Sequence, residues 1–157
     1  MFVLVRCDDR LIHGQCVVRV IKDFSVQRIV VADDFISTNP TLKKICELAA
    51  PAGIQAEVLP VAEVASRAAA YAAAAERVLL LMKSPETAEK LYMQSGDSLP
   101  KELNIGPMSS RKNTKKLAFY CHMTEAEIAA AQHLSDAGVR VYLNQVLGQP
   151  IVEWANI

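Results

Sequence analysis

The sequence has no excess of charge of either sign. Its 157 residues include 17 Lys and Arg against 17 Asp and Glu, so the formal net charge is zero. A balanced chain has no broad attraction to nucleic acid or to anionic lipid. Because 52% of the residues are hydrophobic, the chain can bury a real core, which excludes a disordered protein. We therefore expect one globular domain over residues 1–157, with no nucleic-acid partner.

The sequence also lacks an apolar run long enough to cross a membrane, which needs about 18 residues. Its most apolar stretch, residues 68–75, is bounded by Arg67 and by Glu76-Arg77. The N-terminus opens directly on Phe2-Val3-Leu4-Val5, without the basic segment and cleavage site of a secretory signal. These absences predict a cytoplasmic protein.

Cysteine pairs are absent as well. Cys7, Cys16, Cys46 and Cys121 are scattered, with no C-x-x-C spacing, which favours reduced thiols over a disulfide framework or a zinc site. Cys7, His13 and Cys16 could suggest a metal site, but the spacing leaves the fourth ligand unnamed. We expect neither a metal nor a cofactor.

Short apolar, β-branched runs alternate with longer segments of helical period. This alternation predicts an α/β fold in a single domain, with a mainly parallel β-sheet flanked by helices on both faces. The strands are expected at residues 2–5, 28–32, 56–59, 78–82, 103–105, 117–121 and 139–143. Helices are expected at residues 15–24 and 41–50, over the Ala-rich stretch, after the cap Ser84, and at residues 124–136, where Thr124 and Glu127 can form a capping box.

The loop after the first strand holds the densest group of reactive side chains. Ligands of open α/β sheets bind outside the carboxyl ends of the strands. Here the loop reads Arg6-Cys7-Asp8-Asp9-Arg10-Leu11-Ile12-His13-Gly14-Gln15 and leads directly into a helix. A helix N-terminus attracts anions. The segment therefore predicts an anion site that contains an imidazole.

This group of residue types suits phosphoryl chemistry. A neutral imidazole is a nucleophile toward phosphorus, and a guanidinium can hold phosphoryl oxygens in a bidentate fork. Gly14 would allow close approach, and an aspartate could orient the His13 ring or hold Arg10. The alternative interpretation is a surface histidine among solvated ion pairs.

Two other phosphate-handling classes lack their motifs. No G-x-x-x-x-G-K-[ST] sequence follows any expected strand, which argues against ATP hydrolysis. A receiver-like signalling domain would explain the acidic pair Asp8-Asp9. It requires a phosphoacceptor aspartate after the third strand, where the sequence is Val58-Leu59-Pro60.

The run from Arg6 to Cys16 resembles the active-site loop of a bacterial family, usually R-x-D-D/E-R-L-I-H-G-Q-V. This is the IIB component of the mannose/fructose/sorbose family of the phosphoenolpyruvate-dependent sugar phosphotransferase system (PTS). Residues 30–34, the 103–108 segment Leu-Asn-Ile-Gly-Pro-Met and Gly138-Val139 are also similar to family segments. The length resembles that of a free-standing IIB domain rather than a IIA–IIB fusion.

The resemblance implies a phosphoryl relay, the activity of a protein-N(pi)-phosphohistidine–sugar phosphotransferase. His13 would accept a phosphoryl group from a IIA phosphohistidine and pass it to a sugar at the membrane subunits IIC and IID, at the inner face of the plasma membrane. Arg10 would stabilise the phosphoryl group and Asp9 would orient the site. The residues implied to shape the loop and the helix start are Arg6, Asp8, Gly14 and Gln15.

Several points stay open at this level. A regulatory homologue that senses phosphorylation without transport is the alternative function. The transported sugar, the oligomeric state, including a homo-oligomer, and the phosphorylated ring nitrogen are not indicated. Relatives commonly carry His followed by a Gly-Lys-like segment where this chain has the loop from Ser109 to Asn113. We expect this loop to lie near His13. Its role in specificity for the partner or the sugar system stays open.

Three further features receive structural interpretations. His122 and His133 are expected to be structural or surface residues without a catalytic role. Trp154 is expected to pack the terminal segment against the core or a second subunit. The basic run of Arg111, Lys112, Lys115 and Lys116 is either a solvated loop or a docking patch.

Overall fold

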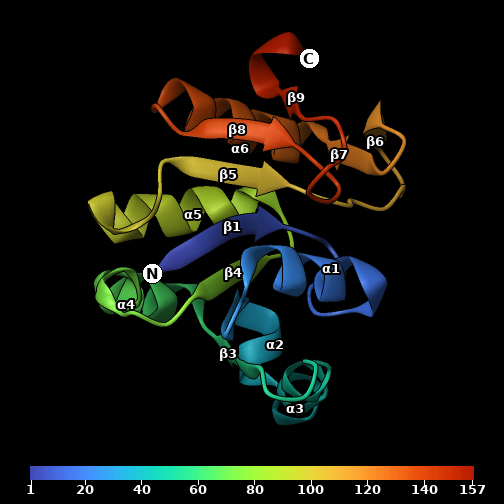
Figure 1. The fold of residues 1–157 in the computed structure, drawn as a ribbon. Helices are drawn as coiled ribbons and strands as arrows, with labels where there is room; N and C mark the ends of the chain where they lie inside the picture. Colours follow the sequence, from blue (N-terminus) through green and yellow to red (C-terminus); the bar gives the residue numbers. More distant parts are fainter.

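Six parallel strands and one antiparallel edge strand form the main sheet of the computed structural model, which describes residues 1–157 (Figure 1). The strand order is β3-β2-β4-β1-β5-β8-β9. The bounds are β1 Phe2–Cys7, β2 Arg28–Ala32, β3 Gln55–Leu59, β4 Val78–Met82, β5 Glu102–Ile105, β8 Arg140–Leu143 and β9 Val152–Glu153. The α/β fold class predicted from the sequence is confirmed.

Six α-helices connect or flank these strands. They are α1 Gly14–Phe24, α2 Asp34–Thr38, α3 Pro40–Leu48, α4 Val61–Ala73, α5 Pro85–Ser95 and α6 Glu125–Asp136, with short 3-10 turns η1 Gly96–Ser98 and η2 Trp154–Asn156. Ser84 caps α5, and Thr124 and Glu127 form the expected capping box of α6. No helix is both long and apolar enough to cross a membrane.

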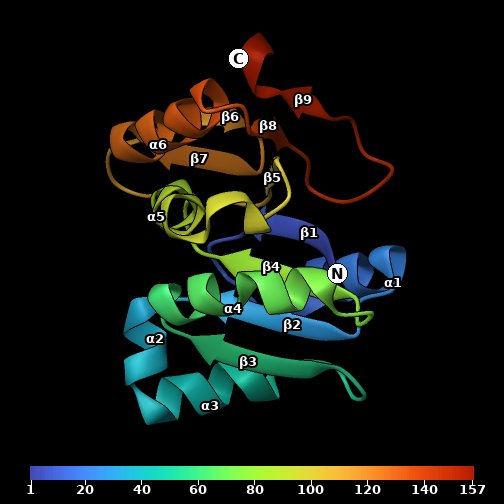
Figure 2. The same ribbon diagram turned by 90° about the vertical axis from the view of Figure 1, so that its left-hand side faces the viewer.

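The sheet separates two hydrophobic cores, as side chains alternate between its faces. On β4, Val78, Leu80 and Met82 pack into the larger core, while Leu79 and Leu81 pack into the smaller one. Helices α4, α5 and α6 supply the larger core and stand in a row on their face of the sheet (Figure 2). Helix α1 and the short α2 cover the other face.

The chain proceeds toward opposite edges of the sheet after β1 and after β5. The chain after β1 passes through α1 to β2, whereas the chain after β5 reaches α6 and β8 on the other side. β1 and β5 are neighbours in the sheet. Their carboxyl ends therefore form the kind of topological switch point where α/β proteins bind ligands.

One predicted strand is wrong. Residues 117–121 do not form a single strand. Instead β6 (Thr114–Ala118) and β7 (Cys121–Thr124) pair as an antiparallel hairpin that turns at Phe119 and Tyr120. The apolar run resembled a buried strand, but Phe119 is 74% exposed at the turn. Helix α2 and the two-residue β9 were not predicted, because both are too short to give a periodic signal.

Candidate functional site

Arg6 is a buried cation at the end of β1. Only 2% of it is exposed, and its Nη1 lies 2.5 Å from Asn104 Oδ1 and 3.2 Å from the Asn144 carbonyl oxygen. Its Nη2 donates to the Gln145 carbonyl oxygen at 2.8 Å and lies 3.6 Å from Asp8 Oδ2. Burial lowers the pKa of Arg6 and raises that of Asp8, although each opposes the shift of the other. Arg6 thus joins β1 to β5 and to the loop after β8.

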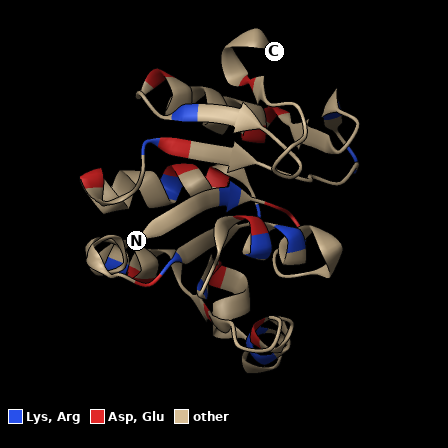
Figure 3. Ribbon diagram, viewed as in Figure 1, with Lys and Arg blue, Asp and Glu red and all other residues tan.

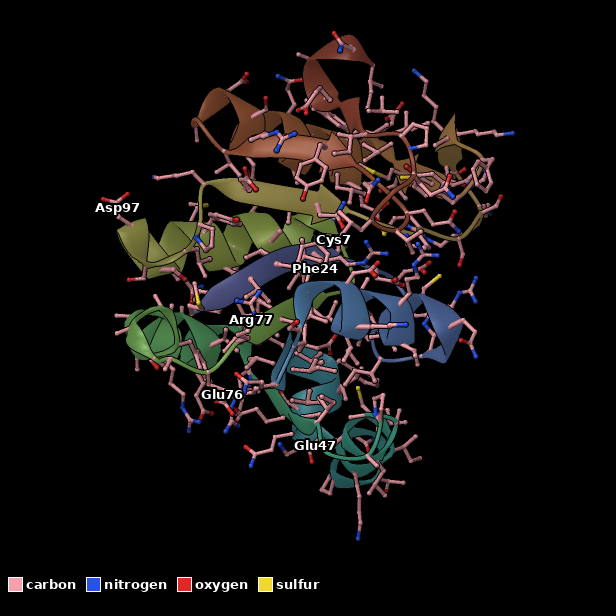
Figure 4. The ribbon with its side chains drawn as sticks, viewed as in Figure 1. Cys7, Phe24, Glu47, Glu76, Arg77 and Asp97 are labelled. Carbon is pink, nitrogen blue, oxygen red and sulfur yellow. The ribbon has the colours of Figure 1, made fainter.

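Gly106 makes room for this guanidinium. A Cβ atom at Gly106 would overlap the guanidinium carbon of Arg6. The Gly106 N–H also donates to the carbonyl oxygen of Cys7 at 2.8 Å, where β1 ends (Figure 4). Asn104 and Gly106 lie in the 103–108 segment that resembles the family, but neither they nor Asn144 are among the predicted site residues. The polar Asn104 in the middle of the apolar run Leu103-Asn104-Ile105, together with that resemblance, was the signal that could have identified the network.

The backbone of the loop turns sharply after Asp8. The Asp8 Oδ1 accepts the Arg10 N–H at 3.2 Å, and the Leu11 N–H donates to the Asp8 carbonyl oxygen at 3.0 Å. Leu11 has a φ of +57°, which is costly for a residue with a branched side chain. The Leu11 side chain is nevertheless buried, so the core holds the turn in place. Figure 3 shows the charges here, with a blue (Lys or Arg) position near the tip of β1 followed by a red (Asp or Glu) segment.

Asp9 binds the neighbouring loop. Its Oδ2 accepts the Ser109 N–H at 2.7 Å, and its own N–H donates to the Pro107 carbonyl oxygen at 3.2 Å. Asp9 Oδ1 is buried without a hydrogen-bond partner. The carboxylate makes no hydrogen bond to the His13 ring, so any orienting effect on His13 passes through the loop.

His13 is the N-cap residue of α1, and its side chain makes no capping hydrogen bond. Its Nε2 lies 3.1 Å from Arg10 Nη1. A guanidinium can only donate, so Nε2 accepts, and a neutral ring then carries its proton on Nδ1. Nδ1 is buried and has no partner. Arg10 forms no ion pair with a carboxylate, so the interpretation of the loop as ordinary solvated ion pairs does not hold for this arginine.

The start of α1 suits an anion. Gly14 has a φ of +55°, a conformation that glycine adopts without strain, and the first turn, which includes Gln15, holds no acidic residue. Free N–H groups and the positive end of the helix dipole therefore face the residues that precede Gly14.

Arg10 and His13 share a pocket of about 310 Å³. No Asp or Glu lines it. Its lining residues are Arg10, His13, Cys16, Pro107, Met108, Ser109, Ser110, Phe119, Tyr120, His122 and Gln145. The expectation that the loop starting at Ser109 lies near His13 is confirmed. His122, expected to be a structural or surface residue without a catalytic role, is partly exposed and lines the pocket together with His13.

The remaining singled-out residues have ordinary structural contacts. His133 Nδ1 lies 2.8 Å from Glu89 Oε1 on the surface, as expected. The buried Trp154 donates to Gln132 Oε1 at 2.9 Å, so it packs the terminal segment against α6. Arg111 pairs with Glu127 at 2.5 Å, whereas the side chains of the three lysines in the basic run make no ion pair.

Comparison with known proteins shows the family to which the chain belongs. The model of the family described as PTS system sorbose subfamily IIB component matches residues 2–157. The chain is 31% identical over 147 residues to the PTS system mannose-specific EIIAB component of Escherichia coli (strain K12), which covers 94% of this chain. The chain spans only 45% of that relative's length.

Two further relatives match over most of both chains. The PTS system fructose-specific EIIB component of Bacillus subtilis (strain 168) is 31% identical over 144 residues, covering 92% of this chain and 87% of that protein. The crystal structure of the IIBSor domain of the sorbose permease from Klebsiella pneumoniae superposes with a TM-score of 0.88 at 27% identity, covering 99% of this chain and 94% of the other. The chain belongs to the sorbose subfamily of PTS IIB components.

Proposed function

We propose that this chain carries phosphoryl groups on His13. It accepts a phosphoryl group from the phosphohistidine of a IIA protein or domain and transfers it to a sugar at the membrane subunits IIC and IID. The chain would act in the cytoplasm, bound to the inner face of the plasma membrane through those subunits. It needs no metal or cofactor of its own for this step.

One observation carries the proposal. The His13 imidazole lies against Arg10 at 3.1 Å, at the N-terminus of a helix, in a pocket without carboxylates. Arg10 has no carboxylate partner, so its remaining N–H groups are free for phosphoryl oxygens. A dianionic group is thus stabilised by the guanidinium and by the helix dipole.

The chemical step balances without a further reactant. A lone pair of the His13 ring forms the new P–N bond while the P–N bond to the donor histidine breaks. The electron pair of the broken bond stays on the donor nitrogen, and the proton that the His13 ring gives up is balanced by the proton that the donor ring takes up. Such a transfer depends on positioning and on charge stabilisation. In this role Arg10 stabilises the phosphoryl group, Asp9 positions the Ser109 loop, and Arg6 and Asp8 hold the base of the site. Gly14 and Gln15 shape the start of the helix.

A labelling and chase experiment tests both halves of the relay. The protein is incubated with phosphoenolpyruvate, the general phosphotransferase proteins and a cognate IIA, and the phosphate on the chain is measured by intact mass. Membranes containing IIC and IID are then added with sugar. We expect one phosphate to appear and then to leave the chain as sugar phosphate.

The chase also separates the carrier from a regulator. A regulatory homologue would accept the phosphate and keep it when membranes and sugar are added. Retained phosphate, with membranes that are active toward their own IIB component, would replace the carrier role by the regulatory one. The absence of any phosphate with an active IIA would contradict both.

A further inference from the structure

We propose that His122 is a second imidazole of the phosphoryl pocket and donates a hydrogen bond to an oxygen of the phosphoryl group on His13. The inference rests on the proposed function of His13. It adds a residue that contacts the transferring group but forms no covalent bond with it.

The alternation of β7 directs His122 toward the pocket. Cys121 and Met123 are fully buried in the larger core, while His122 and Thr124 are partly exposed. Successive side chains of a strand point to opposite faces, so His122 points away from that core. It lines the same 310 Å³ pocket as Arg10 and His13.

The backbone fixes this position. The His122 N–H donates to the Met108 carbonyl oxygen at 2.9 Å, and the Met108 N–H donates to the Tyr120 carbonyl oxygen at 2.9 Å. The adjacent Ser109 N–H is held by Asp9 Oδ2 at 2.7 Å. A chain of hydrogen bonds therefore joins the strand that carries His122 to the loop that carries His13. The two rings are presented by elements with a defined relative position rather than by independent loops.

The ring of His122 has no partner within the chain. It makes no hydrogen bond and no ion pair, whereas the ring of His133 is paired with Glu89. Its neighbour across the hairpin is Lys116, a cation, and no carboxylate lines the pocket. The pocket therefore offers His122 no anionic partner of its own, and an anion that enters it can pair with the ring.

A phosphoryl group can use such a donor. It presents three acceptor oxygens, while one guanidinium fork binds two. Arg10 can thus leave one oxygen without a charged donor. The imidazole N–H of another lining residue, His122, can bind that oxygen, and hydrogen bonds to ionised groups are stronger than those between neutral groups.

The test compares three variants in the intact protein. His122→Ala removes the donor, His122→Gln keeps an N–H donor of similar length, and His133→Ala is the matched control in the paired histidine. The rate of phosphate acceptance from phosphorylated IIA is measured over a range of IIA concentrations. The ³¹P chemical shift of the phosphorylated chain is recorded for each variant.

We expect His122→Ala to lower kcat for acceptance by about 10- to 100-fold, the order seen when one donor to a developing charge is lost. KM for IIA should not change, because the group acts inside the pocket. His122→Gln should recover part of the loss, and His133→Ala should match the wild type. The ³¹P shift should move in His122→Ala and not in His133→Ala.

Three results would overturn the inference. One is an unchanged kcat and ³¹P shift in His122→Ala, and another is a defect confined to KM, which would assign His122 to docking. The third is a phosphate mapped to His122 itself in the wild type. The melting curve shows whether His122→Ala folds. If it does not, His122→Gln becomes the test. The inference then requires that His122→Gln has a lower kcat than the wild type and a shifted ³¹P signal. A wild-type chain that accepts no phosphate would instead refute the proposed function.

Discussion

The molecule has two histidine-containing pockets at opposite ends of the sheet, and they differ in how their charges are paired. The pocket of about 240 Å³ at the amino ends of β5 and β8 includes His133 and Lys101. His133 lies 2.8 Å from Glu89, and Lys101 lies 2.9 Å from Asp97, which is labelled in Figure 4. The His13 pocket contains no carboxylate, and Arg10 has only an imidazole as its side-chain partner.

The difference distinguishes the paired His133 from the unpaired His13. Paired charges satisfy each other and add little binding capacity, as expected for exposed ion pairs. Arg10 has no carboxylate partner, and the buried His13 Nδ1 has no hydrogen-bond partner. Both groups therefore keep hydrogen-bonding capacity that the folded chain does not satisfy. Such arrangements are costly for folding, which is the physical reason for proposing a function at this pocket.

The sharpest test of the difference between the two pockets is to remove the imidazole of His13 and, separately, that of His133. We predict that His13→Ala accepts no phosphate from IIA, because the nucleophile is lost. Its melting temperature should stay near that of the wild type, since His13 is partly exposed on a loop. His133→Ala, measured in parallel by intact mass, should accept phosphate normally. Labelling of His13→Ala at the wild-type level would remove His13 from the mechanism.

Arg10 provides the next largest effect. We predict that Arg10→Lys lowers the rate of phosphate acceptance about 10- to 100-fold, because lysine keeps the charge but loses the bidentate fork. Arg77→Lys is the matched control. Arg77 also lacks a carboxylate partner, but it binds the Phe24 carbonyl oxygen at 3.0 Å, outside the pocket. Equal rates for Arg10→Lys and the wild type in rapid-quench experiments would exclude a bidentate contact between Arg10 and the phosphoryl group.

The close approach of Gly106 to Arg6 gives a stability prediction. Gly106→Ala should lower the free energy of unfolding by about 2 kcal/mol, because the new methyl group overlaps the guanidinium of Arg6. Urea unfolding of the single and double variants measures this coupling. The penalty should shrink in an Arg6→Ala background, since the clash is then absent. A penalty that is the same in both backgrounds would show that Arg6 is not its cause.

The smallest effect is expected at the paired end of the molecule. Glu89→Gln removes the carboxylate that holds His133, and we predict a loss below about 1 kcal/mol of unfolding free energy. Phosphate acceptance should not change. A marked loss of phosphate acceptance would mean that the two pockets are coupled. It would contradict the claim that the His133 pocket plays no part in phosphate acceptance.

Much of the fold follows from local sequence. The observed bounds of β2 and β4, Arg28–Ala32 and Val78–Met82, are those predicted, because β4 is wholly apolar, β2 is apolar after Arg28, and both are largely buried. The hairpin of β6 and β7 was missed, because its aromatic turn has the composition of a strand. Local composition does not report exposure, and Phe119 is exposed only because the chain reverses there.

The site was predictable in part for a similar reason. The residues from Arg6 to Gln15 are contiguous, so their charge, the imidazole and the helix start could be recognised together. Asn104, Asn144 and His122 join them only through the register of β1, β5 and β8 and through the hairpin. No spacing in the sequence encodes these contacts. The hydrogen-bond partner of Asp9 is the Ser109 N–H, a backbone group, so this contact could not be predicted from the sequence either.

The most direct test is to map the phosphate on the wild-type chain after incubation with phosphoenolpyruvate, the general phosphotransferase proteins and a cognate IIA. Fragmentation under conditions that preserve phosphohistidine locates the modified residue. We predict a single acid-labile, alkali-stable phosphate on His13 and none on His122 or His133. A phosphate on another residue, or none with an active IIA, would contradict the claim that the unpaired cationic pocket at His13 is the phosphoryl site.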